Sequence, residues 1–384
     1  MSDPLALYIH VPFCVKKCGY CDFYSIEDHT PKNDYVSGLI TELRLRAQGL
    51  KESMDPRVTS IYFGGGTPSV LDLDHLGSIL DEISCHFHIT PDTEITLEVN
   101  PGTVDPNYLH GLRQMGINRL SIGVQSFDDN KLRFLDRIHT GKQALDCYEQ
   151  AVGAGFDNIG IDLIYAVPGE RPWEWQQDLN RAADLSPAHL SCYMLMVEPG
   201  TLLNASVVNG SVDPPPPESR CAMFTSTSIF LKGCRYEHYE ISNFARSHSL
   251  RSRHNTHYWK RLPYMGFGAG AHSFDGSTRS WNPNDVYQYI DDLGQQVLPA
   301  SEEETLTTDQ VLLELIMLGL RTCEGIDIRQ FNRFSAAPFE KKFEKIIRQL
   351  KEKGWCRVTP ETLALTLEGQ SFLNPVLEMF AKRI

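Results

Sequence analysis

Three cysteines near the N-terminus, spaced C-x3-C-x2-C, are the residues of this chain best suited to chemistry. They are Cys14, Cys18 and Cys21, and they follow a run of alternating apolar residues typical of a strand, Leu5–Val11. Three thiolates on one loop suit a [4Fe-4S] cluster, because they bind three irons and leave the fourth open to a ligand that is not protein. The spacing therefore predicts an iron-sulfur site with one open iron.

Zinc is the main alternative for cysteines at such short spacing. A structural zinc ion needs four protein ligands in a closed tetrahedron. The nearby residues that could complete such a shell are His10, Asp22 and His29. A disulfide framework is not indicated, because the other seven cysteines are scattered singly through apolar segments, as reduced thiols usually are.

Glycines and polar residues recur where further strands are predicted to end. The motif Gly64-Gly65-Gly66-Thr67-Pro68 follows one apolar run, and Glu98, Gln125 and Asp162 stand in or after three others. The glycines allow a ligand to approach the backbone, and no Lys follows them as it would in a nucleotide phosphate loop. Strand ends of a parallel α/β protein converge at one edge, so one shared ligand is expected there. Alternatively, each of these three polar side chains could serve only to hydrogen-bond a neighbouring loop. Arg137 could pair with a ligand carboxylate.

Six apolar runs alternate with segments of helical periodicity between residues 5 and 200. Strand then helix, repeated at near 30-residue spacing, predicts right-handed βαβ units and a parallel sheet. Six units fall short of a closed eight-stranded barrel, and both an open partial barrel and a doubly wound sheet fit the pattern. The predicted strands are Leu5–Val11, Val58–Phe63, Glu94–Val99, Arg119–Val124, Asn158–Ala166 and His189–Val197, and the predicted helices are Tyr35–Ala47, Leu73–Phe87, Pro106–Met115, Lys142–Ala154 and Pro172–Leu185.

A proline run, Pro214–Pro217, ends this repeat, and the pattern changes after it. A helix over residues 218–232 and a strand over Arg235–Ile241 are predicted before the segment Arg251–Phe274, which has no clear period. From about Thr307, two helices followed by a small hairpin predict a winged-helix-like appendix; the helices are Gln310–Leu320 and Pro338–Lys353, and the strands are Trp355–Val358 and Leu363–Leu367. We expect three units: the repeat at 1–240, a segment at 241–300 that covers it, and the C-terminal appendix at 301–384.

Composition and charge exclude some classes of function. The 384 residues include 36 basic and 49 acidic side chains, a formal net charge of -13, so no nucleic-acid partner is expected. No segment approaches 18 apolar residues and the N-terminus lacks a basic region followed by an apolar stretch, so neither a membrane span nor a cleaved signal is predicted. A cytoplasmic, reducing location agrees with ten unpaired cysteines.

Taken together, the motifs resemble the radical S-adenosylmethionine (radical SAM) superfamily. Within it the chain is similar to the oxygen-independent coproporphyrinogen III oxidase group, most closely its HemW branch, over nearly its whole length. The resemblance implies a partial (β/α)6 radical SAM barrel with a small C-terminal HemN-type winged-helix-like α+β domain. It rests on YIHVPFC, YFGGGTPS, LEVNP, SIGVQSF, DLIYAVPG and, later, His254-Asn255-x-x-Tyr258-Trp259 followed by GFGAGAHS.

The resemblance also implies a SAM site beside the cluster. In the superfamily, one electron from the reduced cluster cleaves the sulfonium of SAM to methionine and a 5′-deoxyadenosyl radical, so an electron donor is implied as well. The implied cofactor-binding residues are Tyr8 and Tyr20 beside SAM, Gly65, Gly66 and Thr67 at its methionyl amine, and Glu98, Gln125, Arg137 and Asp162 at its carboxylate and ribose or along the pocket.

HemW proteins are regarded as haem chaperones, so haem or a porphyrin and an unknown haem-acceptor protein are the implied partners. His254 is suited to axial ligation of the iron, with Tyr258 and Trp259 packing on the porphyrin and His272 as a second ligand candidate. The same segment could instead close the bottom of the barrel. The alternative function is that of the oxidase, SAM-dependent radical decarboxylation in porphyrin biosynthesis. The oxidase carries a fourth cysteine where Asp22 and Phe23 stand here, so we predict that this chain lacks the oxidase activity.

Overall fold

A curved sheet of twelve strands forms the centre of the computed structural model, which describes residues 4–49, 57–299 and 301–384. Strands β1 to β6 lie side by side in chain order and are all parallel. A doubly wound sheet would reverse its strand order, so this arrangement is that of a partial barrel. The six strands are β1 Leu5–Val11, β2 Val58–Gly65, β3 Glu94–Val99, β4 Arg119–Gln125, β5 Ile159–Tyr165 and β6 His189–Met194.

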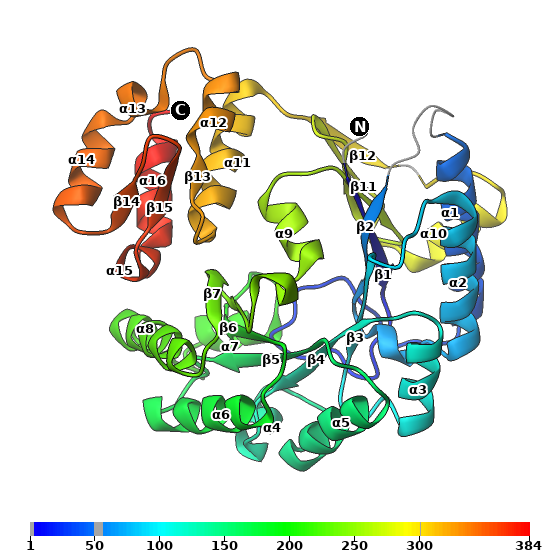
Figure 1. The fold of residues 1–384 in the computed structure, drawn as a ribbon. Helices are drawn as coiled ribbons and strands as arrows, with labels where there is room; N and C mark the ends of the chain where they lie inside the picture. Colours follow the sequence, from blue (N-terminus) through cyan, green and yellow to red (C-terminus); the bar gives the residue numbers. More distant parts are fainter. Residues whose placement is uncertain (1–3, 50–56, 300) are drawn as a thin grey trace.

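Helices cover the convex face of this sheet (Figure 1). Helix α2 shows why: Leu76, Ile79 and Ile83 recur at helical spacing and are fully buried, and Asp72 caps its N-terminus by accepting a hydrogen bond from the His75 amide. The six predicted strands and the five predicted helices are confirmed, with their ends shifted by at most a few residues. The helices of the repeat are α1 Lys32–Gln48, α2 Leu73–His86, α3 Pro106–Gln114, α4 Asp129–Phe134, α5 Gly141–Gly153 and α6 Pro172–Leu185, with a 3-10 turn, η1, at Pro68–Val70.

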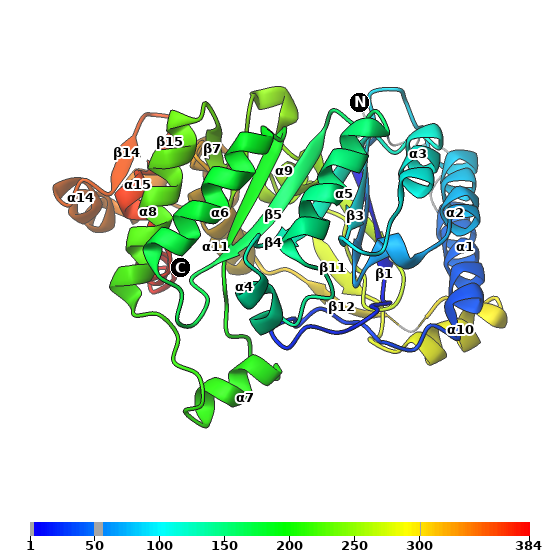
Figure 2. The same cartoon turned by 90° about the horizontal axis from the view of Figure 1, so that it is seen from below.

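Two further helices follow the sixth strand. Helix α7, Leu202–Val208, projects from the body of the barrel, as Figure 2 shows, and the Leu203 amide donates to the Gly19 carbonyl at 2.8 Å, beside the cysteine loop. Helix α8, Pro217–Gly233, begins at the end of the proline run. The chain then enters the sheet again through β7 Glu237–Glu240 and β8 Asn243–Ala245, which extend it beyond β6.

The segment expected to cover the barrel instead mostly adds strands to its sheet. Strand β9 pairs in parallel with β1, and the next three strands continue antiparallel from it. These strands are short and irregular, which is why the sequence shows no period there. Helix α9 lies on the concave side of the sheet (Figure 1). The elements are η2 His248–Leu250, α9 Arg253–Trp259, β9 Tyr264–Phe267, β10 His272–Phe274, β11 Thr278–Trp281, α10 Val286–Gly294 and β12 Glu302–Thr305.

The C-terminal unit has its own core and its own small sheet, in the antiparallel order β13-β15-β14. The predicted helix Pro338–Lys353 is broken at Phe343, whose ring packs edge-on against Phe339 and Phe380 in this core. The proposed domain boundaries at residues 1 and 300 lie outside the described residues. The elements are α11 Thr308–Arg321, β13 Ile326–Asp327, α12 Ile328–Phe334, α13 Phe339–Lys342, α14 Glu344–Glu352, β14 Cys356–Val358, β15 Thr362–Leu365, α15 Leu367–Gln370 and α16 Leu373–Ala381.

Candidate functional site

The cysteine loop connects β1 to α1 and is held closed by backbone hydrogen bonds. The Cys14 amide donates to the Ile26 carbonyl at 2.9 Å, and the Ile26 amide donates to the Pro12 carbonyl at 2.7 Å. Within the loop, the Cys21 amide donates to the Cys18 carbonyl at 3.1 Å. The loop therefore presents its three thiols from a fixed backbone.

The placement of the thiols does not form a site for a single metal ion. In the described part of the chain, no three or more His, Cys, Asp or Glu side chains are arranged to hold one ion. A structural zinc ion requires such a group, so the described residues do not support the zinc alternative. A [4Fe-4S] cluster binds each cysteine through a different iron. Burial raises the pKa of the Cys21 thiol to about 11, so iron binding there would displace a proton.

The three glycines at the end of β2 are required mainly by the packing of the protein against itself. The Gly66 amide donates to the Val11 carbonyl at 2.9 Å, and a Cβ on Gly66 would lie 2.7 Å from the Phe13 carbonyl oxygen. At Gly65 the φ angle is +110°, and a Cβ would lie 2.5 Å from the His10 ring. The glycine motif thus brings β2 against the cysteine loop, in addition to any contact with a ligand.

Polar side chains gather at the carboxyl ends of β2 to β5 around a cavity of about 430 Å³, which we call the rim pocket. Eight of the nine residues predicted for SAM line it, which confirms that the strand ends converge. The rim pocket is lined by Tyr20, Gly65, Gly66, Thr67, Glu98, Gln125, Arg137 and Asp162, together with Cys21, Asp22, Phe23, Tyr62, Asn100, Ser121 and Tyr193.

Three buried polar atoms of the rim pocket have no hydrogen-bond partner in the protein. They are Gln125 Oε1, Asp162 Oδ1 and Arg137 Nε. Gln125 also has a φ of 63°, a left-handed conformation that is costly for a residue with a side chain. Buried polar groups are normally satisfied, so these atoms indicate a polar ligand with both donors and acceptors. The amine, carboxylate and hydroxyls of SAM fit this requirement.

Two carboxyl groups of the rim pocket are hard to ionise. Burial raises the pKa of Glu98 to about 7, and the charge of Asp162 contributes, while a hydrogen bond from the Tyr62 hydroxyl at 2.7 Å opposes the shift. Burial likewise raises the pKa of Asp162, although Ser121 Oγ donates to its Oδ2 at 2.9 Å. A cation or hydroxyl groups from a ligand would stabilise both carboxylates.

A chain of hydrogen bonds joins the rim pocket to the cysteines. Arg137 Nη1 lies 3.7 Å from Cys18 Sγ, and its Nη2 donates to Asn100 Oδ1. Asn100 Nδ2 donates to Thr67 Oγ1 at 2.9 Å, and that hydroxyl lies 3.6 Å from Cys14 Sγ. Sequence reasoning missed Asn100, although it follows Glu98 in the quoted motif LEVNP and stands at the end of the strand.

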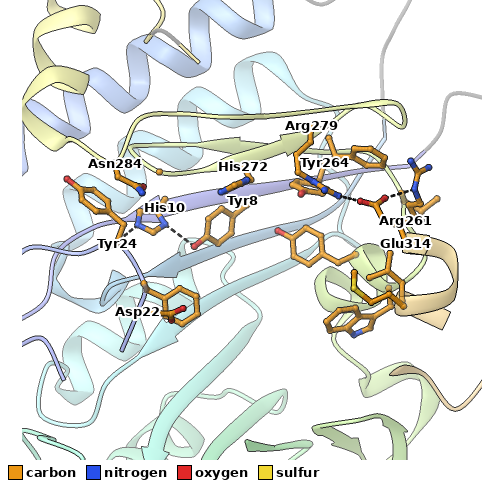
Figure 3. A pocket seen from close by; sticks show the side chains of 18 residues that line it. Tyr8, His10, Asp22, Tyr24, Arg261, Tyr264, His272, Arg279, Asn284 and Glu314 are labelled. Carbon is orange, nitrogen blue, oxygen red and sulfur yellow. Dashed lines mark hydrogen bonds and ion pairs between the residues drawn. The ribbon is translucent and has the colours of Figure 1, made fainter. Parts of the chain in front are cut away.

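Figure 3 shows a second cavity of about 650 Å³, which we call the side pocket. Asp22 and Phe23, the two residues after the cluster motif, line both cavities. The lining of the side pocket is rich in aromatic rings and contains one group of paired charges. It includes Tyr8, His10, Tyr24, Tyr258, Trp259, Tyr264, His272, Phe274, Arg261, Arg279 and Glu314.

Tyr8 lines the side pocket, and its ring also stacks on Tyr62 of the rim pocket. Its hydroxyl is 3.1 Å from His10 Nδ1, and the ring packs near Tyr62 and His254 on the inner face of β1. Strand β9 continues the sheet beyond β1, so the inner face of β1 opens toward the side pocket. The place of Tyr8 beside SAM stays a prediction.

His254 is a core residue in this structure. It is 1% exposed, its Nδ1 lies 3.0 Å from Ser60 Oγ, and its Nε2 lies 2.8 Å from the Tyr258 hydroxyl. Helix α9 is also tied to the first residue of β3, because the His254 amide donates to Glu94 Oε1 at 3.1 Å. Both ring nitrogens are hydrogen-bonded to neighbouring hydroxyls, so ligation of iron by His254 would require one of these bonds to break.

His272 is the histidine that faces the side pocket with an exposed ring. The ring stacks on Trp281 with centroids 5.5 Å apart. Partial burial lowers its pKa, and the charge of Arg279 lowers it further, so the imidazole is neutral at neutral pH. Neutral imidazole is the form that binds metals. Tyr258 and Trp259 also line this pocket.

All ten cysteines, including the three of the loop, are free thiols. No helix among the described residues combines the length and the apolar character that crossing a bilayer would take.

Comparison with known proteins identifies two family models in this chain. The radical SAM superfamily matches residues 8–182, and the HemN C-terminal domain matches residues 306–372. The Heme chaperone HemW of Bacillus subtilis (strain 168) is 33% identical, over 97% of this chain and 98% of that protein. The Heme chaperone HemW of Escherichia coli (strain K12) is also 33% identical, over 98% of each.

Among solved structures, coproporphyrinogen III oxidase (HemN) from Escherichia coli superimposes with a TM-score of 0.83. The match covers 100% of this chain and 91% of that one, at 24% sequence identity. At this identity the match shows a shared fold and leaves the activity open.

Proposed function

This chain belongs to the HemW family of the radical SAM superfamily, and from that membership we propose that it binds haem and passes it to an acceptor protein. The observation that carries the proposal is the side pocket, an aromatic cavity of about 650 Å³ beside the cysteine loop with a neutral imidazole on its wall. Aromatic rings suit the face of a porphyrin, and imidazole suits its iron.

We assign the two other cofactors to the rim pocket and the loop next to it. Cys14, Cys18 and Cys21 would hold a [4Fe-4S] cluster, which when bound supplies single electrons to SAM. The unpartnered atoms of Gln125, Asp162 and Arg137 would meet the polar groups of SAM, with Tyr20 beside it. Arg137 would act at both sites, since it also contacts the Cys18 thiol.

For haem, we propose His272 as the axial ligand in place of His254. The exposed ring of His272 lies on the pocket wall, whereas binding through His254 would break a hydrogen bond to Ser60 or Tyr258 inside the barrel. Tyr258 and Trp259 would contact the porphyrin from α9.

Oxidation of a porphyrinogen is the second candidate function. It is favoured by the shared wall of Asp22 and Phe23, because a ligand of the side pocket would lie next to a ligand of the rim pocket. An anaerobic assay with coproporphyrinogen III, SAM and a reductant tests it: formation of protoporphyrinogen IX would establish the oxidase, and its absence with intact cluster would favour the chaperone.

The remaining partners that we propose for this protein are an electron donor for the cluster and a haem acceptor. A cytoplasmic location suits both, because free thiols and an open iron require a reducing compartment. The net charge of -13 makes nucleic acid an unsuitable partner.

The test of haem binding is a titration of the cluster-loaded protein with ferric haem, followed through the Soret band. His272→Ala should shift the band and weaken binding, whereas His254→Phe, which conserves bulk, should leave the band of the complex in place. An unaltered spectrum in His272→Ala with a shifted one in His254→Phe would reverse the ligand assignment. The absence of any saturable binding by the wild type would refute the haem function itself.

A further inference from the structure

One end of the side pocket is closed by a carboxylate held between two arginines. Glu314 Oε2 accepts from Arg261 Nε at 2.9 Å, and Glu314 Oε1 accepts from Arg279 Nη2 at 2.7 Å. The side chains of Arg261 and Glu314 are only 7% and 11% exposed, whereas Arg279 is 31% exposed. All three line the cavity, as Figure 3 shows.

These charges come from different parts of the chain. Arg261 follows α9 and Arg279 lies on β11, so both cations belong to the barrel, whereas Glu314 lies on α11 of the C-terminal unit. The contact thus connects the two units across the end of the pocket. Other ion pairs also connect them, among them Arg251 with Glu324 and Arg321 with Glu240.

The cations exceed the carboxylate in number, and one of them is incompletely bonded. Arg261 Nη2 is buried and has no hydrogen-bond partner in the protein. Both guanidinium groups also lie over the Phe274 ring, at 4.7 and 5.6 Å from its centroid, which helps to fix them in place. Fixed guanidinium groups bind carboxylates in bidentate fashion, so this arrangement has the donors to hold a second carboxylate.

We propose that Arg261 and Arg279 receive a carboxylate of the ligand in the side pocket, and that Glu314 occupies its position until the ligand arrives. The proposal rests on the proposed function, since haem carries two propionate carboxylates that can exchange with Glu314. The exchange replaces one arginine-carboxylate pair by another, so the arginines are never left buried and unpaired. It also releases α11 from the barrel, so that filling the pocket loosens one contact of the C-terminal unit.

The test compares ferric haem with its dimethyl ester, in which both carboxylates are blocked, on the cluster-loaded protein. The wild type should bind the free diacid roughly tenfold more tightly than the ester, as expected for a charge-assisted contact. Arg279→Gln should abolish most of this preference. Glu314→Gln should strengthen binding of the diacid several-fold and leave binding of the ester unchanged, because it removes only the competing carboxylate.

The matched control is Glu361→Gln, which removes the carboxylate from an exposed pair with Arg329 in the C-terminal unit and should alter neither affinity. Equal affinity of the wild type for diacid and ester would overturn the carboxylate exchange while leaving haem binding intact. So would a Glu314→Gln protein that binds both ligands more tightly by the same factor, since that result indicates a wider pocket entrance. Failure of the wild type to bind either compound would refute the haem function together with this inference.

Discussion

The rim pocket and the side pocket adjoin each other but satisfy their polar groups in opposite ways. In the rim pocket, buried atoms of Gln125, Asp162 and Arg137 have no partner, and the pKa of Glu98 is raised to about 7. In the side pocket, Arg261 Nη2 also lacks a partner, but the charges of both arginines are already paired with Glu314. The rim pocket is therefore incomplete without a polar ligand, whereas a ligand of the side pocket must displace contacts that the protein makes with itself.

The difference bears on how each ligand would be held. A cofactor that completes unpartnered groups gains hydrogen bonds at little cost to the protein, which suits a tightly bound ligand such as SAM. A ligand that exchanges one ion pair for another gains less net free energy. That balance suits a cargo that must also leave, as haem would in a chaperone.

The largest expected effect tests whether the rim pocket depends on a cluster. Cys18→Ala should abolish the cluster, because one of only three cysteine ligands is lost, and iron and sulfide analysis of anaerobically reconstituted protein measures this directly. The control is Cys85→Ala, which removes an exposed thiol outside the loop. A Cys18→Ala protein with a full complement of iron and sulfide would contradict the assignment.

The next effect tests whether the glycine motif serves packing. Gly66→Ala places a methyl group 2.7 Å from the Phe13 carbonyl oxygen, and such overpacking should cost about 1–3 kcal/mol of stability and impair cluster assembly. The control is Gly153→Ala, because a Cβ there meets no atom within 4 Å. Unfolding of the cluster-free proteins measures the stability, and equal stability of the two variants would show that Gly66 is needed only by a ligand.

A smaller effect concerns the pH dependence of the empty rim pocket. The pKa of Glu98 is raised from 4.5 to about 7 in the folded chain, so the folded state retains a proton that the unfolded state has lost. The stability of the ligand-free protein should therefore fall as pH rises between about 4.5 and 7. Thermal unfolding across this range should show a shallower fall in Glu98→Gln. Identical pH profiles for variant and wild type would exclude Glu98 as the source of this pH dependence.

The same variant, Glu98→Gln, should bind SAM roughly tenfold more weakly, through loss of a charged acceptor.

The smallest expected effect concerns Tyr258, which lies on α9 and lines the side pocket. Tyr258→Phe keeps the ring but leaves His254 Nε2 without its partner, so stability should fall by about 1 kcal/mol. The Soret band of the haem complex should not move. A shifted band with unchanged stability would show that the His254–Tyr258 pair acts on the haem and not on the core.

The rim pocket could be predicted from sequence because each of its parts is local. A strand, a glycine or polar residue at its end and a following helix can be recognised in a continuous segment, and the parallel arrangement then brings the ends together. Glu98, Gln125, Asp162 and the glycines were located in this way, whereas Tyr20 was placed only by the family resemblance. That Tyr8 also lines the side pocket could not be predicted, because the pairing of β1 with β9 joins segments more than 250 residues apart.

The side pocket could not be predicted in the same way. Its ion pairs join Glu314 on α11 to Arg279 on β11 and to Arg261 in the loop after α9. Its walls come largely from short strands without a recognisable period. The choice between the two histidines illustrates the point. His254 stands in the more distinctive motif, yet its ring is bonded to Ser60, which lies 194 positions earlier in the chain.

By itself the sequence determined the cysteine loop, the six parallel strands and the polar residues at their ends, because spacing and periodicity act over short stretches of chain. Only the tertiary structure decided that Tyr8 and His272 face the side pocket, that His254 is enclosed in the barrel, and that Glu314 lies between two arginines. The physical reason is that the exposure and the partners of a side chain depend on which distant segments pack against it, and no local pattern records that packing.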